Sequence, residues 1–137
     1  MTPSTAFQGI IPPMITPLKS DFSLDISQTE RLIEHLIDGG VHGIFILGTT
    51  GEFAGLSAAV KRELIQITCQ QVKERVPILV GVTDCSFTES ADLAAIAHRS
   101  GAEAVVAAPP FYMNIGQAEL FHYYQKLADV VELPLFL

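Results

Sequence analysis

The sequence predicts an α/β protein with a parallel sheet. Short, continuous apolar segments alternate along the chain with longer segments in which apolar residues recur at helical spacing. Continuous apolar segments are typical of strands buried on both faces, and strands that alternate with helices are typical of parallel sheets with right-handed crossovers. The predicted order is therefore strand then helix, repeated four times and followed by a fifth strand.

The predicted strands are residues 9–17, 43–47, 77–82, 104–108 and 134–137. The first of these contains three prolines, which fits a strand that ends in a turn, since proline is tolerated at strand ends and edges. The other four are short and almost entirely apolar, as expected of strands in the interior of a parallel sheet.

The predicted helices are residues 26–40, 58–75, 88–100 and 116–131. Ser27 with Glu30 has the spacing of a capping box at the start of the first helix, and Ser57 is expected to cap the second. The pair Gly39-Gly40 should end the first helix and Gly101 the third, because glycine is the usual residue just beyond a helix.

Two architectures fit this order of elements. An open, doubly wound sheet of five strands would be complete in 137 residues. A (β/α)8 barrel typically needs about 250 residues, so this chain would be its first half. Hydrophobic periodicity does not choose between the two.

Composition excludes several classes of function. The chain is 49% hydrophobic and 17% charged, so it can bury a core. Its net charge of −7 argues against a nucleic-acid or anionic membrane surface, and no apolar run reaches the length of a membrane span. Cys69 and Cys85 lack the spacing of a metal or redox motif, which predicts reduced thiols and a cytoplasmic location.

The segment Gly48-Thr49-Thr50-Gly51 follows the second predicted strand and is the strongest candidate for a binding site. Glycines let the backbone turn and approach a ligand, and successive N–H groups in such a turn form an anion-binding concavity. The threonine hydroxyls add groups that both donate and accept. A small carboxylate or phosphate is the expected guest; the alternative is a tight turn that binds nothing.

The remaining strand ends are rich in hydroxyl groups and poor in metal ligands, so no metal site and no cofactor are predicted. Tyr112 follows the fourth strand, where its phenol could relay a proton or cover a ligand; the alternative is a tyrosine used for packing. Glu52 is interpreted as a structural residue of its own loop. Cys85 ends the third strand, but no cationic residue near it in sequence would activate the thiol.

These residues resemble those of a known family. The run Gly48-Thr49-Thr50-Gly51-Glu52 is similar to the carboxylate-binding loop of the dihydrodipicolinate synthase and N-acetylneuraminate lyase family, and residues 108–112 resemble its Pro-Tyr-Tyr stretch. Further matches, in chain order, are Gly9, Thr16-Pro17, Asp25, residues 77–81 and residues 134–137.

The resemblance implies a (β/α)8 barrel, of which residues 1–137 would be the N-terminal half: the first four βα units and the start of strand five. It implies a lyase or aldolase that forms a Schiff base with pyruvate or another 2-oxo acid, in a homotetramer built as a dimer of dimers. Gly48, Thr49, Thr50 and Gly51 would bind the substrate carboxylate. Thr49 would also join a proton relay, which Tyr112 would extend into a neighbouring subunit's site.

The sequence also departs from the family pattern. The family's Schiff-base lysine belongs to the sixth strand, and none of Lys19, Lys61, Lys73 and Lys126 is expected to end a strand. Residues 83–85 stand where many members have a glycine-rich turn. We therefore expect a truncated chain that anchors the substrate, lacks the reacting amine and is inactive alone. The alternatives are a non-catalytic α/β module that binds small anions, or a half-barrel that needs a partner.

Overall fold

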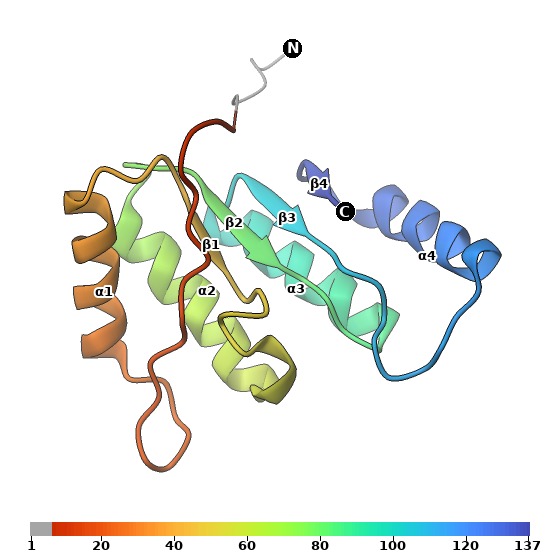
Figure 1. Cartoon of the computed structure of the whole chain (residues 1–137), viewed down its shortest axis with the longest axis horizontal. Helices are drawn as coiled ribbons and strands as arrows, with labels where there is room; N and C mark the ends of the chain where they lie inside the picture. The colour runs from red at the N-terminus through yellow and green to blue at the C-terminus, as the bar shows by residue number, and fades with distance from the viewer. Residues whose placement is uncertain (1–6) are drawn as a thin grey trace.

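The computed structural model describes residues 7–137 and contains one parallel sheet (Figure 1). Its strands are β1 (Ile44–Ile46), β2 (Ile78–Gly81), β3 (Ala104–Val106) and β4 (Leu135–Phe136), and they pair in chain order. Its helices are α1 (Ile26–Asp38), α2 (Ala58–Val72), α3 (Phe87–Ser100) and α4 (Gln117–Val130), with a short 3-10 helix, η1 (Phe53–Gly55). The predicted domain of residues 1–137 includes residues 1–6, which lie outside the described residues.

The helices form a single layer on one face of the sheet (Figure 1). Each helix packs against the next along the chain: α1 on α2, α2 on α3, and α3 on α4. A doubly wound sheet would divide its helices between both faces and would reverse its strand order at a switch point. A one-sided layer with strands in chain order is the arrangement of a (β/α)8 barrel wall.

The predicted first strand, residues 9–17, runs beside β1 but makes only one bridge, between Pro13 and Phe45. The N–H of Met14 donates to the carbonyl oxygen of Phe45 at 2.8 Å, and the N–H of Phe45 donates to that of Pro12 at 3.1 Å. Proline has no N–H to contribute to a ladder, which explains why the pairing here is interrupted. In the barrel wall this segment occupies the position before β1.

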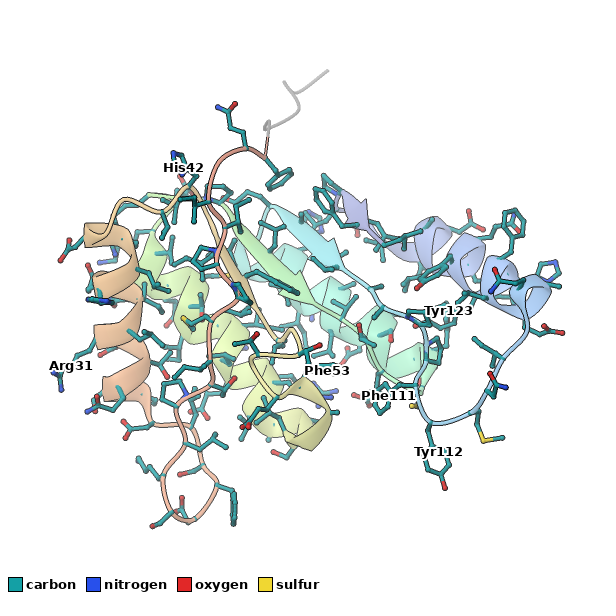
Figure 2. The ribbon with its side chains drawn as sticks, viewed as in Figure 1. Arg31, His42, Phe53, Phe111, Tyr112 and Tyr123 are labelled. Atoms are coloured by element: carbon teal, nitrogen blue, oxygen red, sulfur yellow. The ribbon has the colours of Figure 1, made fainter. Side chains whose placement is uncertain are left out.

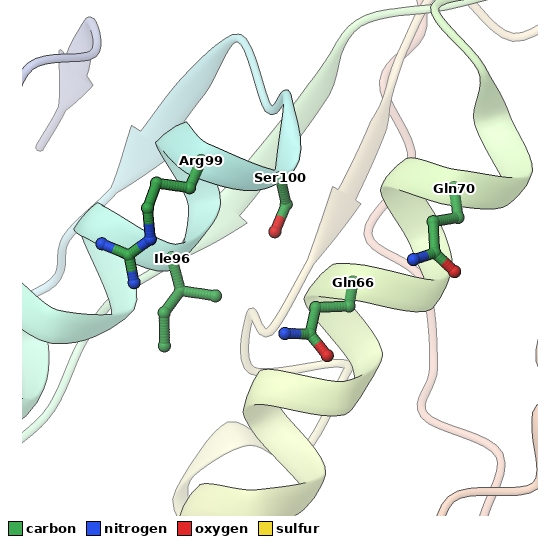
Figure 3. A pocket seen from close by; sticks show the side chains of 5 residues that line it. All are labelled: Gln66, Gln70, Ile96, Arg99 and Ser100. Atoms are coloured by element: carbon green, nitrogen blue, oxygen red, sulfur yellow. The ribbon is translucent and has the colours of Figure 1, made fainter.

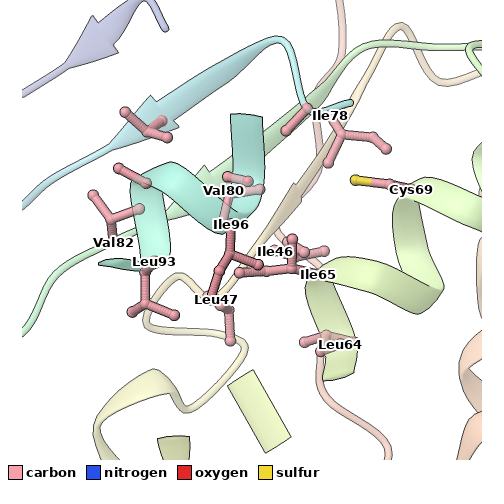
Figure 4. Close-up of a cluster of buried hydrophobic side chains, with 14 of the residues drawn as sticks. Ile46, Leu47, Leu64, Ile65, Cys69, Ile78, Val80, Val82, Leu93 and Ile96 are labelled. Carbon is pink, nitrogen blue, oxygen red and sulfur yellow. The ribbon is translucent and has the colours of Figure 1, made fainter. Parts of the chain in front are cut away.

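The core lies between the sheet and the helical layer (Figure 4). Side chains alternate between the two faces of a strand, so Ile44, Ile46, Ile78 and Val80 point toward the helices, and all four are buried. They pack with residues such as Leu64 of α2. The opposite face of the strands, which carries Phe45 and Gly81, has no helices against it; in a (β/α)8 barrel this face lines the interior.

The helix ends confirm some of the predicted caps and correct one. Ser57 accepts a hydrogen bond from the N–H of Val60 and caps α2, and Gly101, at φ 95°, ends α3, as predicted. The predicted cap of α1 was wrong: Asp25, not Ser27, is the N-cap and accepts from the N–H of Gln28. The Ser27 hydroxyl instead donates to the Asp25 carboxylate at 2.9 Å, because that carboxylate already occupies the helix start.

Within residues 7–137, no helix combines the length and the apolar character needed to cross a membrane. The same residues contain no cluster of His, Cys, Asp and Glu side chains that could hold a metal ion.

Candidate functional site

A cavity of about 190 Å³ lies at the carboxyl ends of β1, β2 and β3, on the face of the sheet that carries no helices. In barrels of this type, ligands bind at this end of the strands. The residues that line the cavity are Phe45, Leu47, Gly48, Thr49, Phe53, Gly81, Thr83, Val106 and Ala108. Its wall is mostly apolar, with hydroxyl and backbone groups at the strand tips.

The loop after β1 turns at residues that are not glycine. Leu47 and Glu52 adopt left-handed backbone angles, with φ of 58° and 56°. The glycines are needed for space: a Cβ on Gly48 would lie 2.6 Å from Cε1 of Phe45, and one on Gly51 would lie 3.1 Å from the carbonyl oxygen of Met14. The sequence predicted that the glycines let the backbone turn, but neither Gly48 nor Gly51 has a positive φ, and what the structure shows is close packing around both positions.

Three hydrogen bonds fix the loop, and the weakest runs from the N–H of Phe53 to the carbonyl oxygen of Gly48 at 3.5 Å. The N–H of Glu52 donates to the carbonyl oxygen of Thr49 at 3.0 Å, and the buried Thr16 hydroxyl donates to the carbonyl oxygen of Gly51 at 2.8 Å. The carbonyl oxygens of Thr49 and Gly51 therefore accept hydrogen bonds, while the N–H groups of Thr49, Thr50 and Gly51 have no acceptor within residues 7–137. An anion needs such free donors.

The structure separates the predicted site residues into two groups. Gly48 and Thr49 line the cavity, whereas Thr50 and Gly51 belong to the same loop but are not among its lining residues. Tyr112 lies outside the cavity in the single chain: its side chain is 83% exposed and points away from the strand ends (Figure 2). Its neighbour Phe111 instead packs edge-on against Phe53, with ring centroids 5.5 Å apart.

Thr83 was not singled out from the sequence, although it lies among the strand-end residues. It is 6% exposed and lines the cavity beside Gly81. Its Oγ1 accepts a 2.8 Å hydrogen bond from the N–H of Ala108, which ties the tip of β2 to the tip of β3. Only its position just beyond an apolar strand could have indicated it, and that signal is shared by every strand end.

Among residues 7–137, the residues that line the cavity include no lysine. Lys61 is buried, and its Nζ lies 3.2 Å from Oδ2 of Asp84. Burial acts to raise the pKa of Asp84, but the N–H of Ser86 and the ammonium of Lys61 outweigh it and lower the pKa below its ordinary value. The charged pair anchors the loop after β2 to α2.

A larger hollow, of about 460 Å³, lies between α2 and α3 in the outer helical layer (Figure 3). It is lined by Gln66, Gln70, Ile96, Arg99 and Ser100. It lies among the helices and shares no lining residue with the strand-end cavity, so the site is assigned to the latter.

The sequence profile of the Dihydrodipicolinate synthetase family matches residues 6–137. The chain belongs to this family. The predicted resemblance is thus confirmed over nearly the whole chain.

Relatives of the family match at the level of both sequence and structure. The 4-hydroxy-tetrahydrodipicolinate synthase of Ralstonia nicotianae is 36% identical over 133 residues, which are 97% of this chain and 45% of that protein. Dihydrodipicolinate synthase from Bacteroides thetaiotaomicron is 51% identical with a TM-score of 0.88, covering 93% of this chain and 43% of that one. The chain spans about 45% of the length of the curated relatives that it matches.

The crystal structure of YagE from Escherichia coli K12, a prophage protein of the dihydrodipicolinic acid synthase family in complex with pyruvate, is similar with a TM-score of 0.91 and 37% identity. It covers 95% of this chain, which in turn covers 44% of YagE. The predicted fold class is confirmed: the chain corresponds to the first four βα units of a (β/α)8 barrel, with β4 as the start of the fifth strand.

Proposed function

We propose that this chain supplies the substrate-anchoring part of a lyase or aldolase site of the dihydrodipicolinate synthase type, which acts on pyruvate or a similar 2-oxo acid. Support comes from family membership and from the strand-end cavity beside a loop with free donors. Residues 1–137 would form the N-terminal half of one barrel domain. A cytoplasmic location belongs to the same proposal and rests on the free thiols of Cys69 and Cys85.

The proposed roles follow from the groups that each residue offers. The N–H groups of Thr49, Thr50 and Gly51, with the Thr50 hydroxyl, would hold the carboxylate, because each is a donor without a partner among residues 7–137. Thr49 lines the cavity and would pass protons through its hydroxyl. Tyr112 is exposed, which is compatible with a role in the site of a neighbouring subunit of a homo-oligomer arranged as a dimer of dimers.

The reacting amine is not assigned to this chain. A lysine that attacks a ketone must be neutral and must reach the substrate. Lys61 is held in an ion pair with Asp84, and within the described part of the chain no lysine lines the cavity. We therefore propose that residues 1–137 bind the 2-oxo acid without forming a Schiff base and are inactive alone.

Borohydride trapping tests whether residues 1–137 bind the 2-oxo acid without supplying the reacting amine. The chain is incubated with pyruvate and borohydride, and its intact mass is measured. No adduct is expected on residues 1–137, whereas a fusion that adds the remaining barrel segment of the Ralstonia nicotianae relative should gain one. An adduct on residues 1–137 alone would overturn the assignment of the amine.

A pyruvate titration followed by amide NMR tests the anchoring role itself. The amide signals of Thr49, Thr50 and Gly51 are expected to shift in a saturable manner. If they do not move while signals elsewhere do, the carboxylate is held at another place and the proposed site is wrong.

Because no lysine among residues 7–137 lines the cavity, two non-catalytic interpretations of this chain also remain. In one, the chain is a module that binds small anions; in the other, it is a half-barrel that pairs with a partner. Both predict that inorganic phosphate or acetate shifts the loop amides as strongly as pyruvate does, and that the fusion gives no trapped adduct. Sedimentation of the chain with and without the complementary barrel segment separates the module from the half-barrel.

A further inference from the structure

Thr83 is a buried hydroxyl that opens into the proposed substrate cavity. β2 ends at Gly81, and alternation along the chain places Thr83 on the same face as Gly81, toward the barrel interior. The side chain is 6% exposed and lines the cavity. It is therefore almost shielded from bulk solvent and yet faces the cavity at these strand tips.

The hydrogen bonds of this hydroxyl are incomplete. A threonine hydroxyl has one proton to donate and two lone pairs to accept. One lone pair of Thr83 accepts from the N–H of Ala108 at 2.8 Å, and among residues 7–137 no acceptor takes the hydroxyl proton. A buried donor without an acceptor is costly, so an acceptor that enters the cavity gains the energy of this bond.

The hydroxyl is also held in place. The next residue, Asp84, accepts from the N–H of Ser86 at 2.9 Å and pairs with the ammonium of Lys61 at 3.2 Å. On the other side, Gly81 packs so closely on the carbonyl of Leu47 that a Cβ would overlap it. Both flanks of Thr83 are thus fixed to neighbouring elements, and little ordering is needed when a ligand binds.

We propose that the Thr83 hydroxyl donates a hydrogen bond to an oxygen of the 2-oxo acid in this cavity. Pyruvate carries only acceptor oxygens, a carboxylate and a ketone, so every polar group that recognises it directly must be a donor. The loop after β1 supplies donors from one side of the cavity, and Thr83 supplies one from the tip of β2. This inference rests on the proposed function and adds a specificity-determining residue to the same site.

The first test is a pyruvate titration of three variants of the 137-residue chain. Thr83→Val keeps the shape and removes the hydroxyl, and is expected to weaken pyruvate binding roughly three- to tenfold, the value of one hydrogen bond. Thr83→Ser retains the hydroxyl and should bind within about twofold of the native chain. Thr68→Val, the matched control, removes a buried hydroxyl from α2 and should leave binding unchanged.

The second test needs no variant. When the Thr83 hydroxyl donates to pyruvate, its oxygen becomes a stronger acceptor, so the Ala108 amide proton should shift downfield in the native chain. An Ala108 signal that stays in place when the loop amides saturate overturns the inference, and so does native affinity in Thr83→Val. In both cases the proposed function stands. Loop amides that fail to respond to pyruvate would refute the proposed function as well as the role of Thr83.

Discussion

The hydroxyl of Thr16 donates a 2.8 Å hydrogen bond to the carbonyl oxygen of Gly51. The two residues are far apart in sequence and both are buried. The bond ties the segment before α1 to the candidate binding loop, and it takes up a carbonyl that would otherwise repel an anion. The geometry of the loop thus depends on a side chain from a different part of the barrel wall.

Replacing Thr16 with valine should therefore disturb both stability and binding. The variant leaves the Gly51 carbonyl buried without a donor, and the free energy of unfolding is expected to fall by about 1–2 kcal/mol. Urea denaturation measures this loss, and pyruvate titration should show weaker binding. Thr16→Ser keeps the hydroxyl and should stay near native values; equal losses in both variants would mean that the hydrogen bond is not the cause.

Gly81 should not tolerate a side chain. A Cβ at this position would overlap the carbonyl oxygen of Leu47, and the backbone of neighbouring strands cannot easily move. Gly81→Ala is expected to lower the free energy of unfolding by about 3 kcal/mol or to prevent folding. Gly55→Ala is the matched control, since no atom lies within 4 Å of its added Cβ, and it should change stability by no more than about 0.5 kcal/mol. A stable Gly81→Ala chain would contradict the close approach of β1 and β2.

Thr68 should gain stability when its hydroxyl is removed. Its Oγ1 is buried without a hydrogen-bond partner among residues 7–137. Valine has nearly the same shape and no polar atom to desolvate, so Thr68→Val is expected to raise the free energy of unfolding by about 1 kcal/mol. Thermal denaturation would show this as a higher midpoint, and a lower midpoint would mean that the hydroxyl has a partner, such as a bound water.

Glu34 should make stability depend on pH under acidic conditions. Hydrogen bonds from Arg75, at 2.6 and 2.8 Å, and from Gln71 lower the pKa of Glu34 from 4.5 to about 2. Because the folded state prefers the ionised form, this contribution is fully present above pH 4.5 and is lost as the pH falls toward about 2. Glu34→Gln should therefore be less stable than the native chain at about pH 7, with the difference disappearing near pH 2.

Urea denaturation across this pH range measures the effect. The pair is exposed, so added salt should reduce the difference between the native chain and Glu34→Gln. Glu63→Gln serves as the control, because the Glu63 carboxylate forms no ion pair within residues 7–137. A Glu34→Gln chain whose stability follows the native pH curve would show that the Arg75 pair does not contribute.

Some features of the fold were predictable because their causes are local. Ser57 and Gly101 mark helix ends through bonds to residues within one turn, and both were placed correctly. The predicted cap at Ser27 was wrong because Asp25 and Ser27 both stand near the helix start, and the sequence alone does not show that Asp25 is the N-cap. In residues 9–17 the prolines reduced a predicted strand to one bridge.

The candidate site was predictable only in part. The Gly-Thr-Thr-Gly segment was found because its composition is unusual after a buried strand. Thr83 was not singled out, because its hydrogen bond to Ala108 and its place in the cavity lining depend on contacts between neighbouring strand ends. The left-handed angles of Leu47 and Glu52 also escaped prediction, because neither residue type favours that conformation.

The sequence by itself determined the alternation of strands and helices and the family to which the chain belongs, and it singled out the candidate binding loop. Those properties follow from periodicity, capping and short motifs, which depend on residues only a few positions apart. Only the tertiary structure decided that the helices form one layer, that Thr16 donates a hydrogen bond to Gly51 and that Lys61 forms an ion pair with Asp84. These depend on contacts between residues far apart in the chain, which form only when the sheet brings the strand ends together.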